Sequence, residues 1–383
     1  MHAWGLALAA SMTLVVASCT GATEPATPTA PSTATATDVP SIEPPPDGPL
    51  VLGAPLPDGC EPGTTGAGQT LAFVAGGRAW ALAPRSGRLT CLFEVARTGP
   101  FAWGPQGDRV LIGGGDVRFL AGGDDVHVDR LGTTPFGWGR PIGKAIVYAE
   151  VRASPGKVSM DDGSVISLRD LPRGSYEAIA YHPSGLALAV SVADDGGTPQ
   201  IFLSTNEGLR PKRIVVGVSA THFPSLGFTD GGRRLIYLAD HLGGFAQVHM
   251  IDLTRPDELV GGWKSQPGVS ASGLVFTPDG GGPIAFTVGT ICDDSVAMTG
   301  SVFAAEPAMP DEGRPTRAVG FLDRRHLLVA VGGCDGSAEL WVAGTNGSEL
   351  VVTDAIVGAS RADGPEEAAP PPKDLIGEIQ EFG

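Results

Sequence analysis

Short apolar runs separated by glycine- and asparagine-rich turns recur from about residue 70 to about residue 355. Runs such as residues 200–203 and 339–342 are followed by the turns Asn206-Glu207-Gly208 and Asn346-Gly347. A short run closed by such a turn is typical of a β-hairpin. No long segment combines an apolar period of 3.6 residues with helix caps. The pattern therefore predicts an all-β domain, and the 56 glycines and 33 prolines agree with many strands and turns.

One unit of this pattern repeats along the chain. Each copy places an aromatic residue before a turn and an aliphatic run after it. The aromatic positions are spaced by 35 to 48 residues and are Trp103, Trp138, Tyr181, Phe228, Phe276 and Phe321. That period is typical of one four-stranded blade of a β-propeller.

The repeats predict a single β-propeller over residues 50–360, built from four-stranded antiparallel blades. Second strands are expected near 71–74, 109–112, 145–149, 186–192, 234–239, 283–288 and 327–331. Only six of them have an obvious first strand ahead. We expect the first blade to take its missing strand from residues 49–54 or 355–359, which closes the ring and covers sheet edges. We therefore predict seven blades, with six as the alternative.

The repeat also resembles a known family. The aromatic strand, the turn Pro278-Asp279-Gly280 and the aliphatic strand that follows resemble the WD40-like repeat of TolB-type β-propellers. The resemblance covers about residues 70–355 and implies the fold. About 20 residues separate the linker from the first repeat, so we expect a propeller without the additional N-terminal domain of TolB itself. The whole chain resembles lipoproteins of that propeller class.

The N-terminus predicts the location. An apolar run over residues 4–16 ends in Val16-Ala17-Ser18-Cys19, which resembles a bacterial lipobox. The run is shorter than the roughly 20 residues that span a bilayer, so we interpret residues 1–18 as a lipoprotein signal peptide. The resemblance implies cleavage before Cys19, attachment of diacylglycerol and fatty acyl chains such as palmitate, and anchoring on the extracytoplasmic face of the cell membrane. The alternative is an ordinary secretory signal that leaves Cys19 unmodified.

Low-complexity segments flank the predicted propeller. Residues 20–49 consist mainly of Thr, Ala, Pro and Ser, so residues 19–49 are expected to be a lipidated cysteine followed by a disordered linker. Residues 361–383 are predicted to be an acidic, proline-rich disordered tail. Two interpretations of the apolar and acidic stretch at 374–382 remain open: it docks onto a partner, or it docks onto the edge of the propeller.

Charge limits the partners. The chain has 26 basic and 42 acidic residues, which gives a formal net charge of −16. Nucleic acid is therefore not expected as a partner, since phosphate binding needs a basic face. Direct adhesion to anionic lipid headgroups is not expected either, and cationic partners are favoured.

The cysteines predict disulfides. Four of the five remain after Cys19, an even number in an oxidising compartment. We predict the pairs Cys60–Cys91 and Cys292–Cys334, the second of which would join successive blades. A zinc site is the alternative, but the cysteines show no Cys-x-x-Cys spacing.

One face of the propeller is predicted to be acidic. The turns between second and third strands all point to the same face, and five of the seven expected turns carry aspartate. These residues are Asp116, Asp194, Asp195, Asp240, Asp293, Asp294 and Asp335. They predict a rim that binds a cationic ligand or a basic patch; the alternative is that aspartate is simply a good turn residue. Asp161, Asp162, Asp293 and Asp294 match no known calcium motif, so no calcium or other metal site is predicted.

No catalytic motif is present. The chain lacks a Gly-x-Ser-x-Gly elbow, His-Glu-x-x-His, a Walker loop and a dinucleotide fingerprint. We therefore expect a non-catalytic, lipid-anchored scaffold that binds proteins of the bacterial envelope. The alternatives are an enzyme or a binder of sugars or peptides that uses the central channel, and a calcium-dependent adhesin.

Overall fold

The structure is a computed structural model, and it describes part of the chain. The described residues lie between 49 and 360, with gaps at 54, 64–68, 96–100, 104–108, 113–115, 120–125, 128–135, 139–144, 149–154, 160–164, 169, 183–185, 195, 206–207, 218, 256–258, 261, 278–281, 291–292, 311 and 333–337. The predictions for the signal peptide, Cys19, the linker and the C-terminal tail fall outside these residues.

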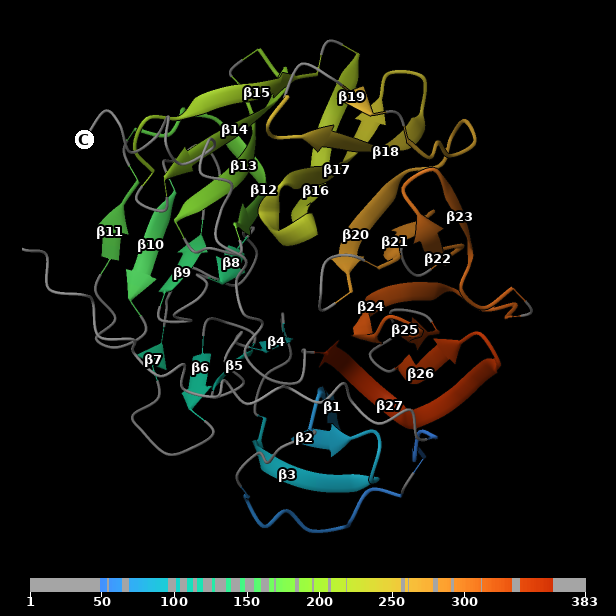
Figure 1. The fold of residues 1–383 in the computed structure, drawn as a ribbon. Coiled ribbons are helices and arrows are strands. Elements are labelled where there is room, and N and C mark those ends of the chain that lie inside the picture. The colour runs from blue at the N-terminus through green and yellow to red at the C-terminus, as the bar shows by residue number, and fades with distance from the viewer. Residues whose placement is uncertain are drawn as a thin grey trace, which may run out of the picture. The chain divides into compact units, whose positions relative to one another are not determined.

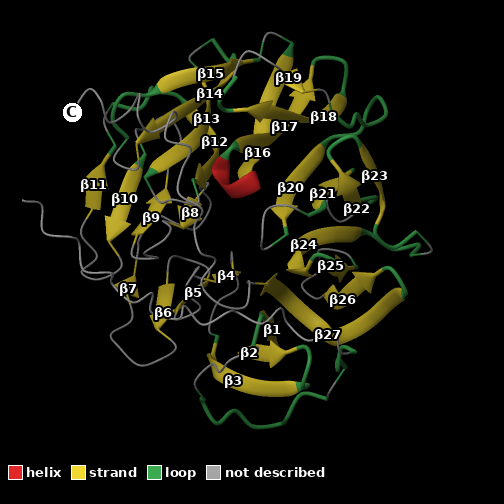
Figure 2. Ribbon diagram, in the orientation of Figure 1, coloured by secondary structure: helices red, strands yellow, loops and turns green. Residues whose placement is uncertain are grey.

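The described residues form antiparallel sheets built from consecutive strands (Figure 2). One four-stranded sheet contains β4 (Phe101–Trp103), β5 (Arg109–Ile112), β6 (Asp116–Phe119) and β7 (Val126–His127). The next contains β8 (Phe136–Trp138), β9 (Ala145–Tyr148), β10 (Gly156–Ser159) and β11 (Val165–Ser167). The third contains β12 (Ser175–Tyr181), β13 (Ala187–Ala193), β14 (Pro199–Thr205) and β15 (Lys212–Val216).

Two more four-stranded sheets and one seven-stranded sheet follow. The fourth contains β16 (Ala220–Thr229), β17 (Arg234–His241), β18 (Phe245–Asp252) and β19 (Leu259–Val260). The fifth contains β20 (Ala271–Phe276), β21 (Ile284–Val288), β22 (Val296–Ser301) and β23 (Ala304–Pro307). The seven-stranded sheet has the order β24 (Thr316–Asp323), β25 (His326–Val331), β26 (Ala338–Gly344), β27 (Gly347–Ser360), β1 (Leu71–Ala75), β2 (Arg78–Ala83) and β3 (Arg88–Glu94).

Helical structure is almost absent from the part of the chain that the structure describes. A single 3₁₀ turn, η2 (Asp230–Gly232), connects β16 to β17. None of the described segments is a helix with the length and apolarity needed to cross a bilayer.

The seven-stranded sheet divides into two four-stranded units, β24–β27 and β27 with β1–β3, and strand β27 is shared by both (Figure 1). Its first half pairs with β26, from Gly344↔Gly347 onward, and its second half pairs with β1, from Ala75↔Ala355 to Leu71↔Ser360. Residues 355–360 therefore supply the missing strand ahead of β1, as one of the two sequence predictions required. The other candidate is wrong, since residues 49–53 form no strand. Among the described strands, counting β27 in both units gives seven four-stranded units, although the hydrogen-bonded sheets number six.

These units form a β-propeller, as the repeat predicted. Neighbouring sheets contact each other through their first strands. Strand β8 contacts β12, β12 contacts β16, β16 contacts β20, and β20 contacts β24. Strand β27 contacts β4. Figure 1 shows these strands near the centre of the ring. We number the units as blades 1 to 7: blade 1 is the end of β27 with β1–β3, blades 2 to 6 begin at β4, β8, β12, β16 and β20, and blade 7 is β24–β27. Each repeated aromatic residue lies in the first strand of its blade.

The core consists of apolar layers between blades. In β17, Leu235 and Tyr237 pack in one cluster with Ile201 of blade 4, while Ile236 packs in another cluster with Phe286 of blade 6. Both faces of the strand are buried, which explains why its sequence is a continuous apolar run rather than an alternation.

His182, which lies in a repeat turn, also belongs to this packing. The side chain is fully buried, its Nε2 lies 3.2 Å from the Gly232 carbonyl oxygen, and its ring meets Phe228 edge-on at 5.0 Å. Gly232 has φ +95°, and a Cβ there would lie 2.0 Å from His182 Nε2. His182 therefore joins blades 4 and 5 and is not part of a surface site.

An N-terminal strap, residues 49–53 and 55–63, crosses blades 1 and 7. Its leucines Leu50, Leu52 and Leu56 pack on the cluster shared by the two blades. The Val51 amide donates to the Pro84 carbonyl at 2.6 Å, and Arg78 Nη1 donates to the Asp58 carbonyl at 2.9 Å. The strap covers part of the region where the ring closes.

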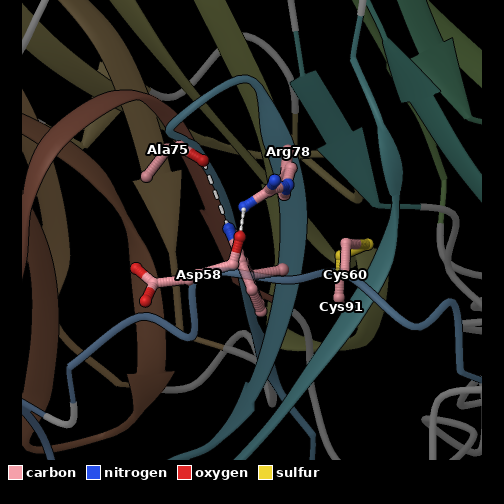
Figure 3. The surroundings of a disulfide bond; sticks show 6 residues. Asp58, Cys60, Ala75, Arg78 and Cys91 are labelled. Carbon is pink, nitrogen blue, oxygen red and sulfur yellow. Dashed lines mark hydrogen bonds between the residues drawn. A yellow bond between two sulfur atoms is a disulfide. The ribbon is translucent and has the colours of Figure 1, made fainter.

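A disulfide fixes the strap to β3 (Figure 3). Cys60 is bonded to Cys91, with a Cα–Cα distance of 5.4 Å, and the Gly63 amide donates to the Cys91 carbonyl at 2.9 Å. The structure therefore contains the predicted Cys60–Cys91 pair. The second predicted pair, Cys292–Cys334, lies outside the described residues.

Replacing Cys60 and Cys91 together by serine is expected to lower the free energy of unfolding by about 2–4 kcal/mol, because the bond joins residues 31 positions apart. Denaturant titration of the oxidised proteins would measure the loss. Equal midpoints for the double variant and the wild type would contradict the stabilising role. Reductant added to the double variant is the control, and any further loss would report a second disulfide between Cys292 and Cys334.

Candidate functional site

The described aspartates of the predicted acidic rim lie where second strands meet third strands. Asp116 begins β6, Asp194 follows β13, Asp240 is the penultimate residue of β17, and Asp293 and Asp294 lie between β21 and β22. These junctions belong to blades 2, 4, 5 and 6. Because antiparallel strands alternate in direction, the starts of the first strands lie on the same face, which we call the turn face. Asp195 and Asp335 are not among the described residues.

Asp194 stabilises its own turn. Its Oδ1 accepts hydrogen bonds from the amides of Gly196 at 3.0 Å and Thr198 at 2.9 Å, and its Oδ2 accepts one from Gln200 Nε2 at 2.8 Å. Asp294 does the same, accepting from the Thr290 amide at 2.7 Å. These contacts fit the alternative interpretation that Asp194 and Asp294 are there to stabilise turns, although their charge still contributes to the turn face.

Asp240 differs because it lies within a strand and is partly buried. Its Oδ1 has no hydrogen-bond partner among the described residues, whereas its carboxylate accepts a hydrogen bond from the Ala271 amide at the start of β20. Burial raises the pKa of Asp240, opposed by the Ala271 amide and the nearby His222. Glu177 raises this pKa further, and His241 lowers it. Asp240 Oδ1 is therefore a buried acceptor without a partner, next to other titratable groups.

Glu177 and His222 connect blades 4 and 5 on the turn face. Glu177 Oε1 lies 2.6 Å from His222 Nδ1, and Oε2 accepts a hydrogen bond from the Phe223 amide at 2.7 Å. The Glu177 side chain is 15% exposed and that of His222 is 61% exposed. A mostly buried carboxylate thus orients an exposed imidazole, and the ring's Nε2 is left for other contacts.

An aromatic stack extends through blade 5. Phe223 meets Tyr237 edge-on at 5.3 Å, Tyr237 stacks on His249 at 5.1 Å, and His249 meets His241 at 5.8 Å. His241 Nε2 and His249 Nδ1 are buried and have no hydrogen-bond partner in the described structure. Burial, and then the nearby His241, lower the pKa of His249 from 6.5 to about 4. His249 is therefore neutral at pH 7.

We call Glu177, His222, Asp240, His241 and His249 the blade 5 cluster. Of these residues, only Asp240 was predicted as a site residue from the sequence. Glu177 and His222 are separated by 45 positions and form no spacing motif. The usable signal was topological, because both residues lie near the starts of successive first strands, which a propeller places side by side.

The cluster forms no metal site among the described residues. Within the described ranges, no group of three or more His, Cys, Asp or Glu residues is arranged to hold a metal ion. Asp161 and Asp162 are not among them. A pocket of about 260 Å³ lies elsewhere, between the start of the strap at Pro49 and Leu50, His326 and the β26–β27 turn.

No family model matches this sequence, and no curated protein matches it. Solved structures do resemble it. A prolyl endopeptidase structure superposes with a TM-score of 0.53 at 11% identity, covering 75% of this chain and 50% of that chain. The β-propeller domain of Cps50 (Swd1) from Myceliophteria thermophila has a TM-score of 0.50 at 16% identity, covering 70% of this chain and 90% of that chain. TolB from Acinetobacter baumannii has a TM-score of 0.45 at 12% identity, covering 78% of this chain and 68% of that chain. At these identities, the likeness to the first two structures shows the β-propeller fold alone.

Acidification is expected to destabilise the protein through His249. An unfolded imidazole binds a proton near pH 6.5 and the folded one near pH 4. Between these values the unfolded state binds more protons, so stability falls as pH falls, by up to about 3 kcal/mol. His249→Phe keeps an aromatic ring against Tyr237 and is expected to flatten this dependence, measured by denaturant unfolding at several pH values. A slope unchanged in His249→Phe would assign the effect elsewhere.

Proposed function

We propose that this protein is a lipid-anchored β-propeller on the extracytoplasmic face of the bacterial cell membrane. It acts as a non-catalytic scaffold that binds other envelope proteins. The observation that carries the proposal is the gathering of carboxylates on one rigid face. Asp194, Asp240, Asp293 and Asp294 lie at the second-to-third strand junctions of three successive blades, and Glu177 lies beside Asp240.

The charge of this face favours a basic surface on the partner. The whole chain carries a net charge of −16, so opposite charges would accelerate encounter and orient the partner. A propeller presents such a surface with little ordering cost, since its turns are held by the sheets beneath them. The same charge argues against nucleic acid as a partner.

The anchor is proposed from the lipobox-like residues that end at Cys19. Each buried methylene adds roughly 0.8 kcal/mol, so two or more acyl chains would hold the protein durably. The linker over residues 20–49 would reach about 30 Å as a coil and up to about 90 Å if polyproline-like. That reach would let the turn face meet partners away from the membrane surface.

The anchor is tested with Cys19→Ala. The variant is expected to lose membrane association in a carbonate wash, whereas the wild type should remain in the pellet. Mass spectrometry of the mature N-terminus should find an acylated cysteine only in the wild type. If both proteins stay in the pellet, or if the wild type carries an unmodified Cys19, the ordinary secretory signal is the correct interpretation.

The scaffold is tested by crosslinking in cells followed by affinity purification. Asp293→Lys combined with Asp294→Asn changes the turn face by three charge units, and the asparagine keeps an acceptor for the Thr290 amide. We expect recovery of a stoichiometric envelope partner to fall several-fold. The matched control, Glu349→Lys with Glu306→Gln, changes charge equally at sites outside the second-to-third strand junctions. Recovery of the propeller alone, or equal losses in both variants, would contradict the proposed face.

A second candidate function has one observation in its favour. The exposed His222 ring is held by the mostly buried Glu177, and such a pair suits proton transfer or recognition of a small polar ligand. Thermal-shift screening of sugars and short peptides with the wild type and His222→Gln tests it. A ligand that stabilises the wild type and not the variant would support this alternative.

A further inference from the structure

Exposed apolar side chains gather where blades 3 and 4 meet, two blades that are neighbours in the ring (Figure 1). Seven large apolar residues are exposed in the described part of the chain, and four of them belong to this boundary. They are between 44% and 57% exposed, and we call them the blade 3–4 patch: Ile166, Leu186, Leu209 and Val216. Single exposed apolar residues are normal, whereas a group of neighbouring ones marks an interaction surface.

Backbone contacts bring Leu186 and Leu209 together. Leu186 directly precedes Ala187, which pairs with Thr205 across β13 and β14. The Thr205 amide donates to the Leu209 carbonyl at 3.2 Å, and the Leu209 amide donates to Thr205 Oγ1 at 3.0 Å. The turn after β14 is therefore fixed, and binding there would cost little ordering entropy.

Ile166 joins the patch from blade 3. It lies two residues before Leu168, so the two side chains share one face of the extended chain. Leu168 packs against the turn of blade 4, since a Cβ on Gly208 would lie 2.7 Å from the Leu168 Cβ. Gly208 directly precedes Leu209, and the patch thus crosses the boundary between the blades.

Val216 and Arg213 lie on the same side of blade 4. Val216 pairs with Gln200, which in turn pairs with Val192 of the apolar cluster between blades 3 and 4. Arg213 pairs with Phe202, which packs on that cluster, and its Nη1 donates to Gln200 Oε1 at 3.4 Å. Paired residues share a face of the sheet, so both side chains face blade 3.

Basic side chains border the patch. Arg210, Lys212 and Arg213 are all exposed and follow Leu209 in the sequence. Together with Glu207, which lies outside the described residues, they give residues 206–213 three positive charges and one negative charge. This is the densest basic run in a chain whose net charge is −16. The surface therefore favours an occupant that is both apolar and acidic.

Residues 374–382 have the complementary composition. Their four apolar residues are spaced as on one face of a helix and are Leu375, Ile376, Ile379 and Phe382. Their three charged residues are all acidic, would lie together on one side of that face, and are Asp374, Glu378 and Glu381. Nine residues are too few for a stable isolated helix, so such a segment would become ordered only against a surface that covers its apolar face.

The chain between the propeller and this segment is long enough. Ser360, the last residue of β27, pairs with Leu71, and Figure 1 shows this end of β27 near the centre of the ring. Residues 361–373 would span at most about 45 Å when extended. A domain of this size has a radius of gyration of about 20 Å, so the spacer can reach the boundary of blades 3 and 4.

We propose that residues 374–382 dock on the blade 3–4 patch of the same molecule. The apolar face of the segment covers the four patch residues, and its acidic side meets Lys212 and Arg213. A partner protein that used the patch would have to displace the segment. This inference goes beyond the proposed scaffold function and depends neither on the lipid anchor nor on the acidic turn face.

The test uses the full chain with Cys19→Ala and a photoreactive residue in the segment, Phe382→p-benzoylphenylalanine. After irradiation, mass spectrometry locates the crosslinks. We expect most of them in peptides that contain Ile166, Leu186 or residues 209–216. Because the contact is intramolecular, the crosslinked fraction should not change when the protein is diluted tenfold.

Variants of the patch locate the contact. Leu209→Ser is expected to lower the crosslinked fraction at least fivefold. The matched control is Leu242→Ser, since Leu242 is 73% exposed in the β17–β18 turn and lies outside the patch. The thermal midpoint of each variant would show that the fold is kept.

Charge exchange tests the orientation of the segment. Glu378→Lys with Glu381→Lys is expected to lower the crosslinked fraction about fivefold in dilute salt, and adding Lys212→Glu with Arg213→Glu should restore it. The control for the second pair is Arg233→Glu with Arg234→Glu in blade 5, where the side chains are 55% and 42% exposed. This control should restore nothing.

Several outcomes would overturn the docking of the segment. They are an absence of crosslinks, crosslinks that map elsewhere on the propeller, and equal losses in Leu209→Ser and Leu242→Ser. A crosslinked fraction that falls on dilution, with crosslinked dimers, would mean that the patch takes the segment of a second copy. If Leu209→Ser abolishes recovery of an envelope partner while the wild type shows no internal crosslink, the patch belongs to that partner. The scaffold proposal would survive each of these results, since it is tested on the turn face.

Discussion

The pairing of β27 with β1 is the contact on which the propeller depends. Ala355 is paired with Ala338 of blade 7 and with Ala75 of blade 1, so one strand serves two neighbouring units. Without this pairing β1 and β27 would each present an open edge, and such edges invite association with other chains. The contact also joins residues nearly 290 positions apart, as in Leu71↔Ser360. Long-range pairing of this kind carries a large loop-closure cost and is expected to form late in folding.

Ring closure has a direct effect on the candidate site. A closed ring holds successive first strands side by side, so residues that are distant in sequence meet on one face. Glu177 of β12 bonds to His222 and to the Phe223 amide of β16, and Asp240 of β17 accepts from the Ala271 amide at the start of β20. These bonds link blades 4, 5 and 6. The cluster is thus a product of blade order rather than of any local motif.

The fold was largely predictable because its signals are local and repeated. Each aromatic position, such as Phe228 in β16, marks a first strand, and the turns that follow are short. The strand shared by two blades was also predictable in outline, since one blade lacked a first strand. The Cys60–Cys91 pair was predicted from an even number of cysteines and an expected oxidising compartment, and the structure contains it.

The chemistry of individual polar residues was far less predictable. Asp194 and Asp240 look alike in sequence, yet one caps a turn and the other has an oxygen without a partner. The difference comes from register and from burial by the next blade, neither of which residue type reveals. Likewise His182 lies in a repeat turn but is buried against Gly232, because the neighbouring blade encloses it. Tertiary context decides these roles.

The Cys60–Cys91 bond also decides how the domain would respond to tension. A pull on residue 49 would first peel the strap, breaking the Val51–Pro84 hydrogen bond, and would then stop at Cys60. From there the load would enter β3, the outer strand of blade 1, at Cys91. In the reduced protein the same pull would continue along the chain to Leu71 and load the β1–β27 ladder from its end at Ser360. The disulfide therefore diverts mechanical force away from the seam that closes the ring.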